Sequence, residues 1–445
     1  MIRRKFLLIC FLFTLIEDSL EKLIGVIQFT RHGARTPLDY FEIFKEDFFP
    51  FGEGELTYEG FIMANEKGKN MRKLYLKKHE DFYSELEKNP KAIKIFSSPI
   101  QRTILTSLAY LKGLFPNFKL SYVQNEAIID LNNLLQGRYP SLKMDKKFLK
   151  KMNEKEENKH LSINIEVFQQ ECRFSYKPKC VVLKETTSKE KENKKDILIS
   201  NRQYRHILDF KSSYPRLFEE YCVEIYKRGN SMENDSNSDD CPEDTFKSQA
   251  FLSKIAGVLN SIDFHKLKQV NPELLNLSYI SYIKVHHERI DINEAKIEGS
   301  NQMRYIKGFL SNVKNCNNNF SQSFEDFDSS NDPEEILNFL EKELHCRKYA
   351  LFSLHDDNLY AIIRSLYDVQ KDMDYLFDNF EIMSNEEINE YLEFYWPIYV
   401  SDFTFELQED EENNEEYVRI FFNGKELKNK RFFSNILEYS EKGII

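Results

Sequence analysis

Residues 23–37 read LIGVIQFTRHGARTP and form the most informative stretch of the chain. The apolar run at its start has the length of a buried strand, and it ends in polar, reactive side chains. Arg31 and Arg35 flank His32, and guanidinium groups match tetrahedral oxyanions in geometry and charge. An imidazole between two guanidiniums is costly to place without an anion. The stretch therefore predicts a strand that ends in an anion-binding loop, in which Gly33 lets the backbone turn and approach a ligand.

Two later apolar runs end in the same way. Residues 92–96 (AIKIF) are followed by a helical pattern that begins near Arg102, and residues 349–354 (YALFSL) run into His355 and Asp356. Short apolar runs followed by helical patterns suit the interior of a parallel or mixed sheet. The sequence therefore predicts an α/β fold with a central mixed sheet flanked by helices. Ligands of such sheets bind beyond the carboxyl ends of the strands, where all the reactive residues occur.

The reactive residues form a complementary set when the three strand ends are considered together. The first end supplies an imidazole and two guanidiniums, the second a further guanidinium, and the third a His-Asp pair. The second and third groups stand where helices are expected to begin, and helix N-termini favour anions. Cations, a nucleophile and an acid are what the transfer of a dianionic phosphoryl group requires. The set therefore indicates phosphoryl transfer.

The pattern changes between residues 131 and 300, where stretches rich in Lys and Glu interrupt short apolar pieces. This composition predicts an inserted, mostly helical cap domain with solvated loops. The α/β core would then consist of residues 21–130 and 301–445. Near the end, residues 402–408 (DFTFELQ) and 417–422 (YVRIFF) each alternate between polar and apolar side chains, and they flank an acidic connection. That alternation predicts a β-hairpin.

The N-terminus has the pattern of a secretory signal peptide over residues 1–20. Basic residues precede an apolar run that Glu17 and Asp18 end too early for a membrane span. We therefore expect no stable membrane anchor, and a location that is secreted or in the lumen of a lysosome or vacuole. An even number of cysteines follows the signal, which is compatible with disulfide bonds, although their pairing is not assigned. Three N-glycosylation sequons are compatible with a glycoprotein. These residues are Cys172, Cys180, Cys222, Cys241, Cys316 and Cys346, and Asn234, Asn276 and Asn319.

Composition excludes one broad class of protein. The 445 residues include 73 acidic and 62 basic side chains, which give a net charge of −11. Proteins that hold nucleic acids through phosphate contacts are usually basic, so no nucleic-acid partner is expected. The oligomeric state stays open, with a homodimer as one alternative. The run His286-His287-Glu288 predicts a solvated segment and no metal site, because adjacent side chains on a strand point to opposite faces.

Further motifs accompany the RHGARTP loop. They are ELTYEG at 55–60, MRKLY at 71–75, QRT at 101–103, GLFP at 113–116, WP at 396–397, DFTFEL at 402–407, YVR at 417–419 and NG at 423–424. In the order and spacing of these motifs the chain resembles the histidine acid phosphatases, branch 2 of the histidine phosphatase superfamily. The resemblance covers roughly residues 22–120 and 300–425. It implies a Rossmann-like phosphatase core.

The resemblance also implies a two-step phosphatase mechanism on a small-molecule phosphomonoester. His32 would attack phosphorus and become a phosphohistidine, which water would then hydrolyse. Asp356 would protonate the leaving alcohol. No metal or cofactor is required, because arginines supply the positive charge. The residues that would hold the phosphoryl oxygens are Arg31, Arg35, Arg102 and His355.

Two departures from the family pattern concern this site. Residues 99–101 (PIQ) stand where the family has Asp-x-Asp, and Asp357 stands where the family commonly has Thr. A second carboxylate beside the donor would repel the substrate phosphate or raise the pKa of Asp356. Neighbouring cations and a helix N-terminus act in the opposite direction and favour the charged carboxylate. A bound phosphate should raise the donor's pKa again, so an acidic pH optimum is expected.

Three other functions compete with a broad acid phosphatase. A phytase or inositol-polyphosphate phosphatase is disfavoured by the acidic flank at residues 38–42 (LDYFE), although Asn358 is a phytase-like feature. A non-catalytic relative that binds phosphorylated ligands would be marked by loss of His32 or of the His-Asp pair, and both are present. A mutase is disfavoured because that branch places Glu or Gln after RHG and lacks a secretory signal.

Overall fold

A computed structural model describes the chain in separate ranges. Residues 1–20 and all the cysteines named above lie outside them, so the signal peptide and the disulfide bonds stay predictions. The described ranges are 21–38, 53–124, 127–130, 162–167, 201–213, 249–266, 270–289, 305–310, 312–313, 344, 347–366, 370–380, 382–411, 413–427 and 431–432.

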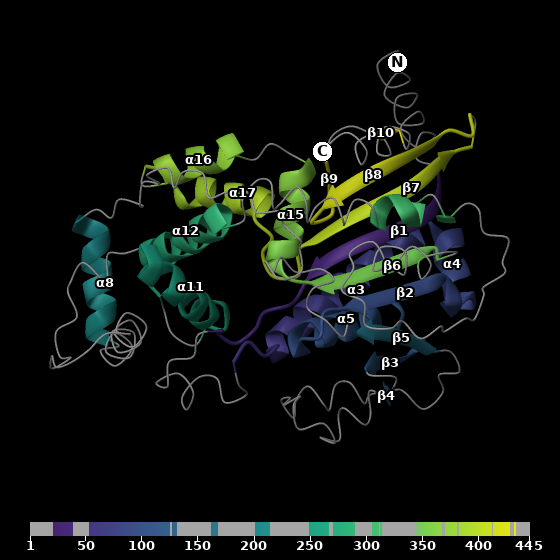
Figure 1. Ribbon diagram of the computed structural model, residues 1–445, viewed down its shortest axis with the longest axis horizontal. Helices are drawn as coiled ribbons and strands as arrows, with labels where there is room; N and C mark the ends of the chain where they lie inside the picture. Colours follow the sequence, from purple (N-terminus) through teal and green to yellow (C-terminus); the bar gives the residue numbers. More distant parts are fainter. Residues whose placement is uncertain are drawn as a thin grey trace, which may run out of the picture.

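The three predicted strands lie side by side at the centre of one mixed sheet (Figure 1). They are β1 (Glu21–Arg31), β6 (Tyr349–Leu354) and β2 (Ile93–Ser97), and neighbouring members of this trio run parallel. Arg31 of β1 pairs with Leu354 of β6, and Ser353 of β6 pairs with Ser97 of β2. The carboxyl ends of the three strands therefore meet at one edge, and the predicted α/β fold class is confirmed.

The remaining strands extend the sheet on both sides of this trio. The described strands follow the order β10-β8-β7-β1-β6-β2-β5-β3-β4, with β9 paired to β8. The predicted hairpin is confirmed, because β7 (Asp402–Asp410) and β8 (Glu416–Phe422) pair antiparallel. The other strands are β3 (Lys119–Gln124), β4 (Ala127–Asp130), β5 (Ser162–Val167), β9 (Lys425–Glu426) and β10 (Arg431–Phe432).

One piece of the predicted insertion belongs to the sheet. β5 lies within residues 131–300 and pairs in parallel with β2 on one side and β3 on the other. The sequence analysis missed it because the strand is short and lies among lysine-rich stretches. The described helices of that segment lie beside the sheet together with two helices from the C-terminal part of the chain (Figure 1). A separate cap domain with boundaries at 131 and 300 stays a prediction.

Helices cover both faces of the sheet. One face packs on helices that follow β1 and β2, in a cluster that includes Leu105 and Tyr349. The other face packs on α15 (Asp356–Leu366), and the same cluster, which includes Phe352 and Trp396, continues into the helices that lie beside the sheet. The helices of the first face are α3 (Tyr58–Lys78), α4 (Glu80–Lys88) and α5 (Gln101–Leu114), and the short η1 (Pro90–Ala92) comes directly before β2. Further described helices are α8 (Asn201–Ser213), α11 (Gln249–Phe264), α12 (Pro272–Arg289), α16 (Gln370–Asn379) and α17 (Asn385–Tyr395).

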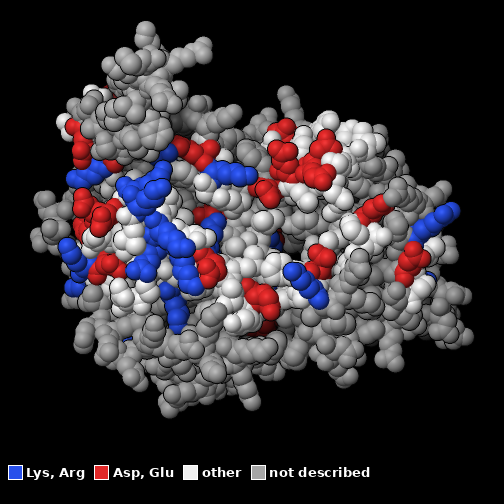
Figure 2. Space-filling view, turned by 180° about the vertical axis from the view of Figure 1, so that it is seen from behind, with Lys and Arg blue, Asp and Glu red and all other residues white. Residues whose placement is uncertain are grey.

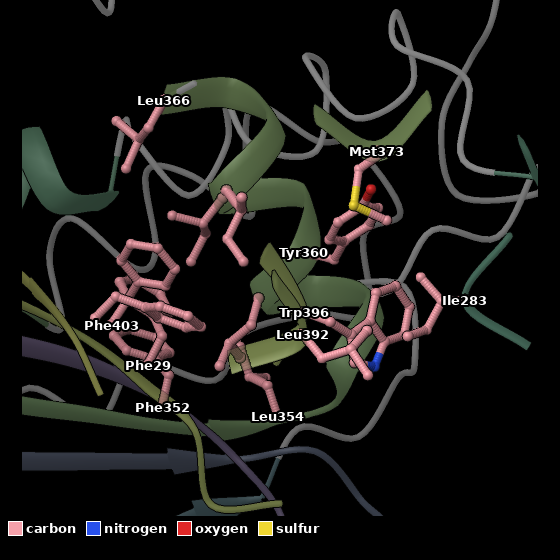
Figure 3. Close-up of a cluster of buried hydrophobic side chains, with 14 of the residues drawn as sticks. Phe29, Ile283, Phe352, Leu354, Tyr360, Leu366, Met373, Leu392, Trp396 and Phe403 are labelled. Atoms are coloured by element: carbon pink, nitrogen blue, oxygen red, sulfur yellow. The ribbon is translucent and has the colours of Figure 1, made fainter. Parts of the chain in front are cut away.

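Stacked phenylalanines fix the three central strands to one another. The ring of Phe352 on β6 stacks on Phe29 of β1 and on Phe96 of β2, with both centroid distances 4.9 Å. Figure 3 shows Phe29 and Phe352 close to Phe403, with Tyr360 and Trp396 on the helical side of the same cluster. Offset aromatic pairs add specificity to the large apolar area that the rings bury. This packing holds the strand ends in place.

Charges of both signs occur on the face shown in Figure 2. There, Lys and Arg side chains gather in a stripe over one half, and acidic side chains form separate groups. The net negative charge is therefore unevenly spread over this face. Within the described ranges, no helix is long and apolar enough to cross a membrane.

Helices α3 and α5 pack backbone against backbone. A Cβ atom added to Gly68 would lie 2.0 Å from the carbonyl oxygen of Tyr110, and one added to Gly113 would lie 2.2 Å from that of Asn65. Backbone atoms cannot move aside as a flexible side chain can. The two glycines therefore set the distance between the helices that hold one face of the sheet.

We predict that Gly113→Ala destabilises the protein by about 1–3 kcal/mol, because the new methyl group overpacks this crossing. Gly257→Ala on α11 is the matched control, since a Cβ there meets nothing within 4 Å. The control should be neutral or stabilising by up to about 1 kcal/mol, because Ala favours helix over Gly. Thermal or denaturant unfolding measures both. Equal stability of the two variants would contradict the packing argument.

Candidate active site

His32 follows β1 directly and is held by the backbone on both sides. Its N–H donates to the carbonyl of Leu354 at 3.1 Å, and its own carbonyl accepts from the N–H of Val400 at 3.2 Å. The side chain is 1 % exposed. The imidazole therefore has a fixed position at the carboxyl edge of the sheet.

A hydrogen bond determines which ring nitrogen of His32 is free. Nδ1 lies 2.8 Å from the carbonyl oxygen of Gly33. A carbonyl only accepts, so Nδ1 must carry the proton, and the neutral ring then has its lone pair on Nε2. Burial, followed by the charges of Arg102 and Arg31, lowers the pKa of His32 well below its usual value. His32 is therefore a neutral imidazole with an available lone pair.

The loop after His32 owes its shape to a close approach of two backbone segments. A Cβ on Gly33 would lie 2.3 Å from the carbonyl oxygen of Gly60, in the first turn of α3. The backbone angle of Gly33 is not in the left-handed region. Packing against α3 therefore requires a glycine at this position, and the interpretation that Gly33 also lets a ligand approach stays a prediction. Thr57 caps that helix, and its hydroxyl accepts from Gly60 N–H at 3.2 Å.

Three arginines surround the strand ends, as predicted from their positions in the sequence. Arg31 is held by Pro397 O at 2.6 Å, and Arg35 by the carbonyl of Thr36 at 2.8 Å. Arg102, at the start of α5, lies 3.3 Å from the carbonyl of Gly54. Burial and then the charge of Arg35 lower the pKa of Arg102 to about 10. The arginines are thus crowded enough to repel one another.

His355 belongs to a chain of hydrogen bonds in which Arg102 determines the tautomer of the imidazole. Arg102 can only donate, so Nδ1 of His355, 3.4 Å from Nη2, is the acceptor. Nε2 of His355 then donates to Ser98 Oγ at 3.0 Å, and the hydroxyls of Ser98 and Thr103 share a hydrogen bond of 2.7 Å. The hydroxyl of Thr103 in turn donates to the carbonyl of Ile100, at 2.8 Å. His355 is therefore neutral, and burial followed by Arg102 lowers its pKa to about 3.

Asp356 is the first residue of α15 and is 7 % exposed. Its Oδ2 lies 2.7 Å from Arg31 Nη2 and 3.1 Å from the hydroxyl of Tyr282. Burial is the largest single effect on the pKa of Asp356 and would raise it. The charges of Arg31, His286 and Arg35 outweigh burial, so the pKa lies well below its usual value. Asp356 is therefore an ionised carboxylate, as the sequence predicts.

The structure brings all the predicted site residues together. The rings of His32 and His355 lie edge to face with centroids 5.4 Å apart, and Arg31 links this pair to Asp356. With both histidines neutral, three guanidinium charges minus one carboxylate charge leave two positive charges in this set. Each guanidinium also has a buried Nε with no partner in the described parts of the chain. Buried polar atoms without partners call for an explanation, and a doubly charged oxyanion supplies one.

Several site residues were not found from the sequence. Tyr282 and His286 of α12 contact Asp356 and Asp357, respectively. Ser261 of α11 contacts the carbonyl of Arg35, and His265, directly after that helix, contacts the cap Thr57. Each pair is spaced four residues apart, so a search for polar residues at helical spacing would have found them. Tyr399, whose ring lies 4.7 Å from the guanidinium of Arg31, follows the WP motif closely.

The prediction of a solvated segment at residues 286–288 is wrong. These residues end the helix α12, on which neighbouring side chains point about 100° apart. His286 lies 3.0 Å from Asp357, whereas His287 is buried and lies 2.5 Å from the hydroxyl of Tyr360. Over the described residues, no group of His, Cys, Asp and Glu side chains is arranged to hold a metal ion.

Comparison with known proteins identifies the family. The family model of the histidine phosphatase superfamily (branch 2) matches residues 22–423. The chain belongs to this family. Prostatic acid phosphatase of Bos taurus is 35 % identical over 88 residues, which cover 19 % of this chain and 21 % of the relative. The human protein of the same name is 36 % identical over 88 residues, covering 19 % and 22 %. The aligned stretches thus span about a fifth of these curated relatives.

Two solved structures are also similar to the chain. The phytase of Hafnia alvei has a TM-score of 0.48 at 13 % identity, with 96 % of this chain and 98 % of that chain covered. A Bifidobacterium longum multiple inositol polyphosphate phosphatase has a TM-score of 0.43 at 10 % identity, with 93 % and 88 % covered. Similarity at this level does not indicate a substrate.

We predict that Arg102→Gln weakens the binding of inorganic phosphate by about 10- to 100-fold, because a charge-assisted hydrogen bond is lost. Lys112→Gln, in the last turn of the same helix, removes the same charge away from the site and should leave binding unchanged. Isothermal titration calorimetry measures both variants. Equal losses of phosphate affinity in the two variants would show that long-range charge, and not a local contact of Arg102, governs binding.

Proposed function

We propose that the chain is a phosphomonoesterase that transfers the phosphoryl group of its substrate to His32 and then to water. The observation that carries this proposal is the excess of two positive charges around a neutral imidazole. A phosphomonoester dianion carries two negative charges, so it compensates the repulsion among the arginines. Membership of the histidine phosphatase superfamily supports the same reaction.

In the first step, Nε2 of His32 attacks phosphorus and forms a P–N bond while the bond to the leaving oxygen breaks. Nδ1 keeps its proton, which the carbonyl of Gly33 stabilises as charge develops on the ring. The leaving oxygen takes a proton from Asp356. The groups proposed to hold the phosphoryl oxygens are Arg31, Arg35, Arg102 and His355.

In the second step, water attacks the phosphohistidine and the P–N bond breaks. Asp356, now a carboxylate, accepts the proton of the attacking water. Inorganic phosphate leaves, and His32 returns to the neutral form with its proton on Nδ1. The arginines supply the positive charge throughout, so the proposed reaction uses no metal or cofactor.

The proton donor requires a change in its surroundings when substrate binds. Arg31 binds the carboxylate of Asp356 in the free site and holds its pKa down. A bound dianion shares Arg31 and adds negative charge nearby, and both effects raise the pKa of Asp356. Activity requires the protonated carboxyl, so it is present below that raised pKa and is lost as the pH rises through it. The proposed enzyme is therefore an acid phosphatase.

A pocket beside the arginines favours an ordinary monoester over an inositol polyphosphate. It has a volume of about 250 Å³ and is lined largely by aromatic and apolar side chains, including Phe264, Tyr279 and Tyr399. Among its described lining residues, Arg31 and Arg35 are the cations, whereas a polyphosphate needs further positive charge. Asn358, the phytase-like feature of the sequence, is buried, and its side chain accepts from the N–H of His355 at 3.1 Å.

We predict that hydrolysis of p-nitrophenyl phosphate in EDTA peaks at acidic pH and falls as pH approaches neutrality. His32→Ala should lose about 10³-fold or more of kcat, because the nucleophile is gone. His79→Ala, at the end of α3, is the matched control and should retain activity. Steady-state kinetics from about pH 3 to about pH 9 test this. Activity that stays flat to about pH 8 would count against Asp356 as the donor.

We also propose that the protein is secreted or delivered to a lysosomal or vacuolar lumen. The support is the basic and apolar pattern of residues 1–20. The expected result is that protein purified from the medium or lumen lacks this segment, as N-terminal sequencing would show. Retention of these residues in the secreted protein would contradict the signal-peptide interpretation.

A further inference from the structure

Helix α12 places Tyr282 and His286, which are one helical turn apart, against the two consecutive carboxylates of α15. The hydroxyl of Tyr282 lies 3.1 Å from Asp356 Oδ2, and Nδ1 of His286 lies 3.0 Å from Asp357 Oδ1. The Tyr282 and His286 rings contact each other, with centroids 4.2 Å apart. Both rings also lie 6.0 Å from that of Trp396, which is fully buried. The pair is therefore packed in a fixed position.

The hydrogen bond from Tyr282 acts on the charged form of Asp356. Burial, followed by the charge of Asp356, raises the pKa of Tyr282 well above its usual value, so its hydroxyl stays protonated and donates. It donates to Oδ2, the same oxygen that Arg31 contacts at 2.7 Å. A donor to a carboxylate stabilises the ionised form. Tyr282 thus fixes the orientation of this carboxyl group and opposes its protonation.

His286 acts on the neighbouring carboxylate. The side chain of Asp357 is 43 % exposed, whereas that of His286 is 17 % exposed. Asp357 Oδ1 is an acceptor, so Nδ1 of His286 carries a proton. The contact holds Asp357, the residue that replaces the family's usual Thr, and it directs a hydrogen-bond donor at a negative charge beside the site. Without His286, that charge would face an incoming dianion uncompensated.

We propose that Tyr282 and His286 are positioning residues for the proton donor, Tyr282 by orienting the carboxyl of Asp356 and His286 by restraining Asp357. This inference rests on the proposed function, because it assumes that Asp356 protonates the leaving group. In this proposal, α12 sets the pH range in which Asp356 can donate a proton. It also allows the site to carry Asp357 as a second carboxylate beside the donor.

Several groups from other elements also face Asp356, so a pH effect must be separated from theirs. They come from the end of β1, the loop after it, the starts of α5 and α15, and the segment before β7. These groups are Arg31, Arg35, Arg102, His355 and Tyr399, together with Tyr279 of α12. Tyr282→Phe removes one hydrogen bond and leaves all these charges in place, which makes it a selective probe.

The first test uses glycerol 2-phosphate, whose alkoxide is a poor leaving group and therefore needs the donor. In Tyr282→Phe the carboxylate loses a donor, so the alkaline limb of kcat should move to higher pH by about 0.5–1 unit. Tyr391→Phe on α17 is the matched control, because that tyrosine packs on Tyr375 and Tyr395 outside the site. This control should keep the alkaline limb of kcat at the pH of the wild type.

The second test separates KM from kcat. His286→Gln should raise KM about 5- to 10-fold, because Asp357 is released beside the phosphate. Adding Asp357→Asn to His286→Gln should restore KM, since the repelling charge is removed. His287→Gln, the next residue on α12, changes a buried contact to Tyr360. His287→Gln should lower thermal stability without changing KM or the alkaline limb of kcat.

Asp356→Asn separates failure of this inference from failure of the proposed function. If Asp356→Asn hydrolyses glycerol 2-phosphate as the wild type does, the donor role is wrong and the inference fails with it. The other outcome is that Asp356→Asn is inactive, while folded Tyr282→Phe keeps the alkaline limb of kcat of the wild type and folded His286→Gln keeps its KM. In that case the proposed function stands and the inference about α12 is overturned. Circular dichroism and thermal unfolding establish that each variant is folded.

Discussion

The parallel pairing of β1 with β6 is the constraint on which the rest of the site depends. Its register sets Arg31 opposite Leu354, so that the residues following each strand emerge side by side. His32 and the His-Asp pair are far apart in the sequence, and this ladder alone makes them neighbours. The stacked rings of Phe29, Phe352 and Phe96 oppose any slip of that register, because a slip of one residue would turn every ring to the other face.

The position of the strand ends has an electrostatic consequence. Guanidiniums that arrive from three segments are brought together in a largely buried place, where charges are weakly screened. Burial, together with the charges of these guanidiniums, keeps His32 and His355 neutral and lowers the pKa of Arg102 to about 10. One carboxylate, Asp356, offsets part of this charge in the free site. The same excess of charge is what we propose to be used for the phosphoryl group.

The sequence predicted those parts of the fold that have a local signal. Apolar runs of strand length located β1, β2 and β6, and alternation located the β7–β8 hairpin. The six candidate site residues followed from one rule, that ligands lie beyond the carboxyl ends of strands. The low pKa of Asp356, the proposed proton donor, followed from its position among cations.

What was missed depends on contacts between distant segments. Gly33 is required by Gly60 of α3, which no pattern around Gly33 reveals. Helix α12 is buried on several sides, so its apolar residues follow no single stripe, and Tyr282 and His286 did not stand out from it. β5 (SINIEV) does alternate, but over only 6 residues within a lysine-rich segment that was predicted to be helical, and its pairing with β2 and β3 shows that it belongs to the sheet.

The proposed role of His32 is that of a neutral nucleophile that carries the phosphoryl group. It is tested most directly by quenching the Asp356→Asn variant in alkali during turnover of p-nitrophenyl phosphate, because the P–N bond survives alkali. Peptide mapping by mass spectrometry then locates the added phosphoryl group. The expected result is a phosphohistidine at His32, and no label in a variant that also carries His32→Ala. A phosphoryl group on any other residue, or none during steady turnover, would contradict it.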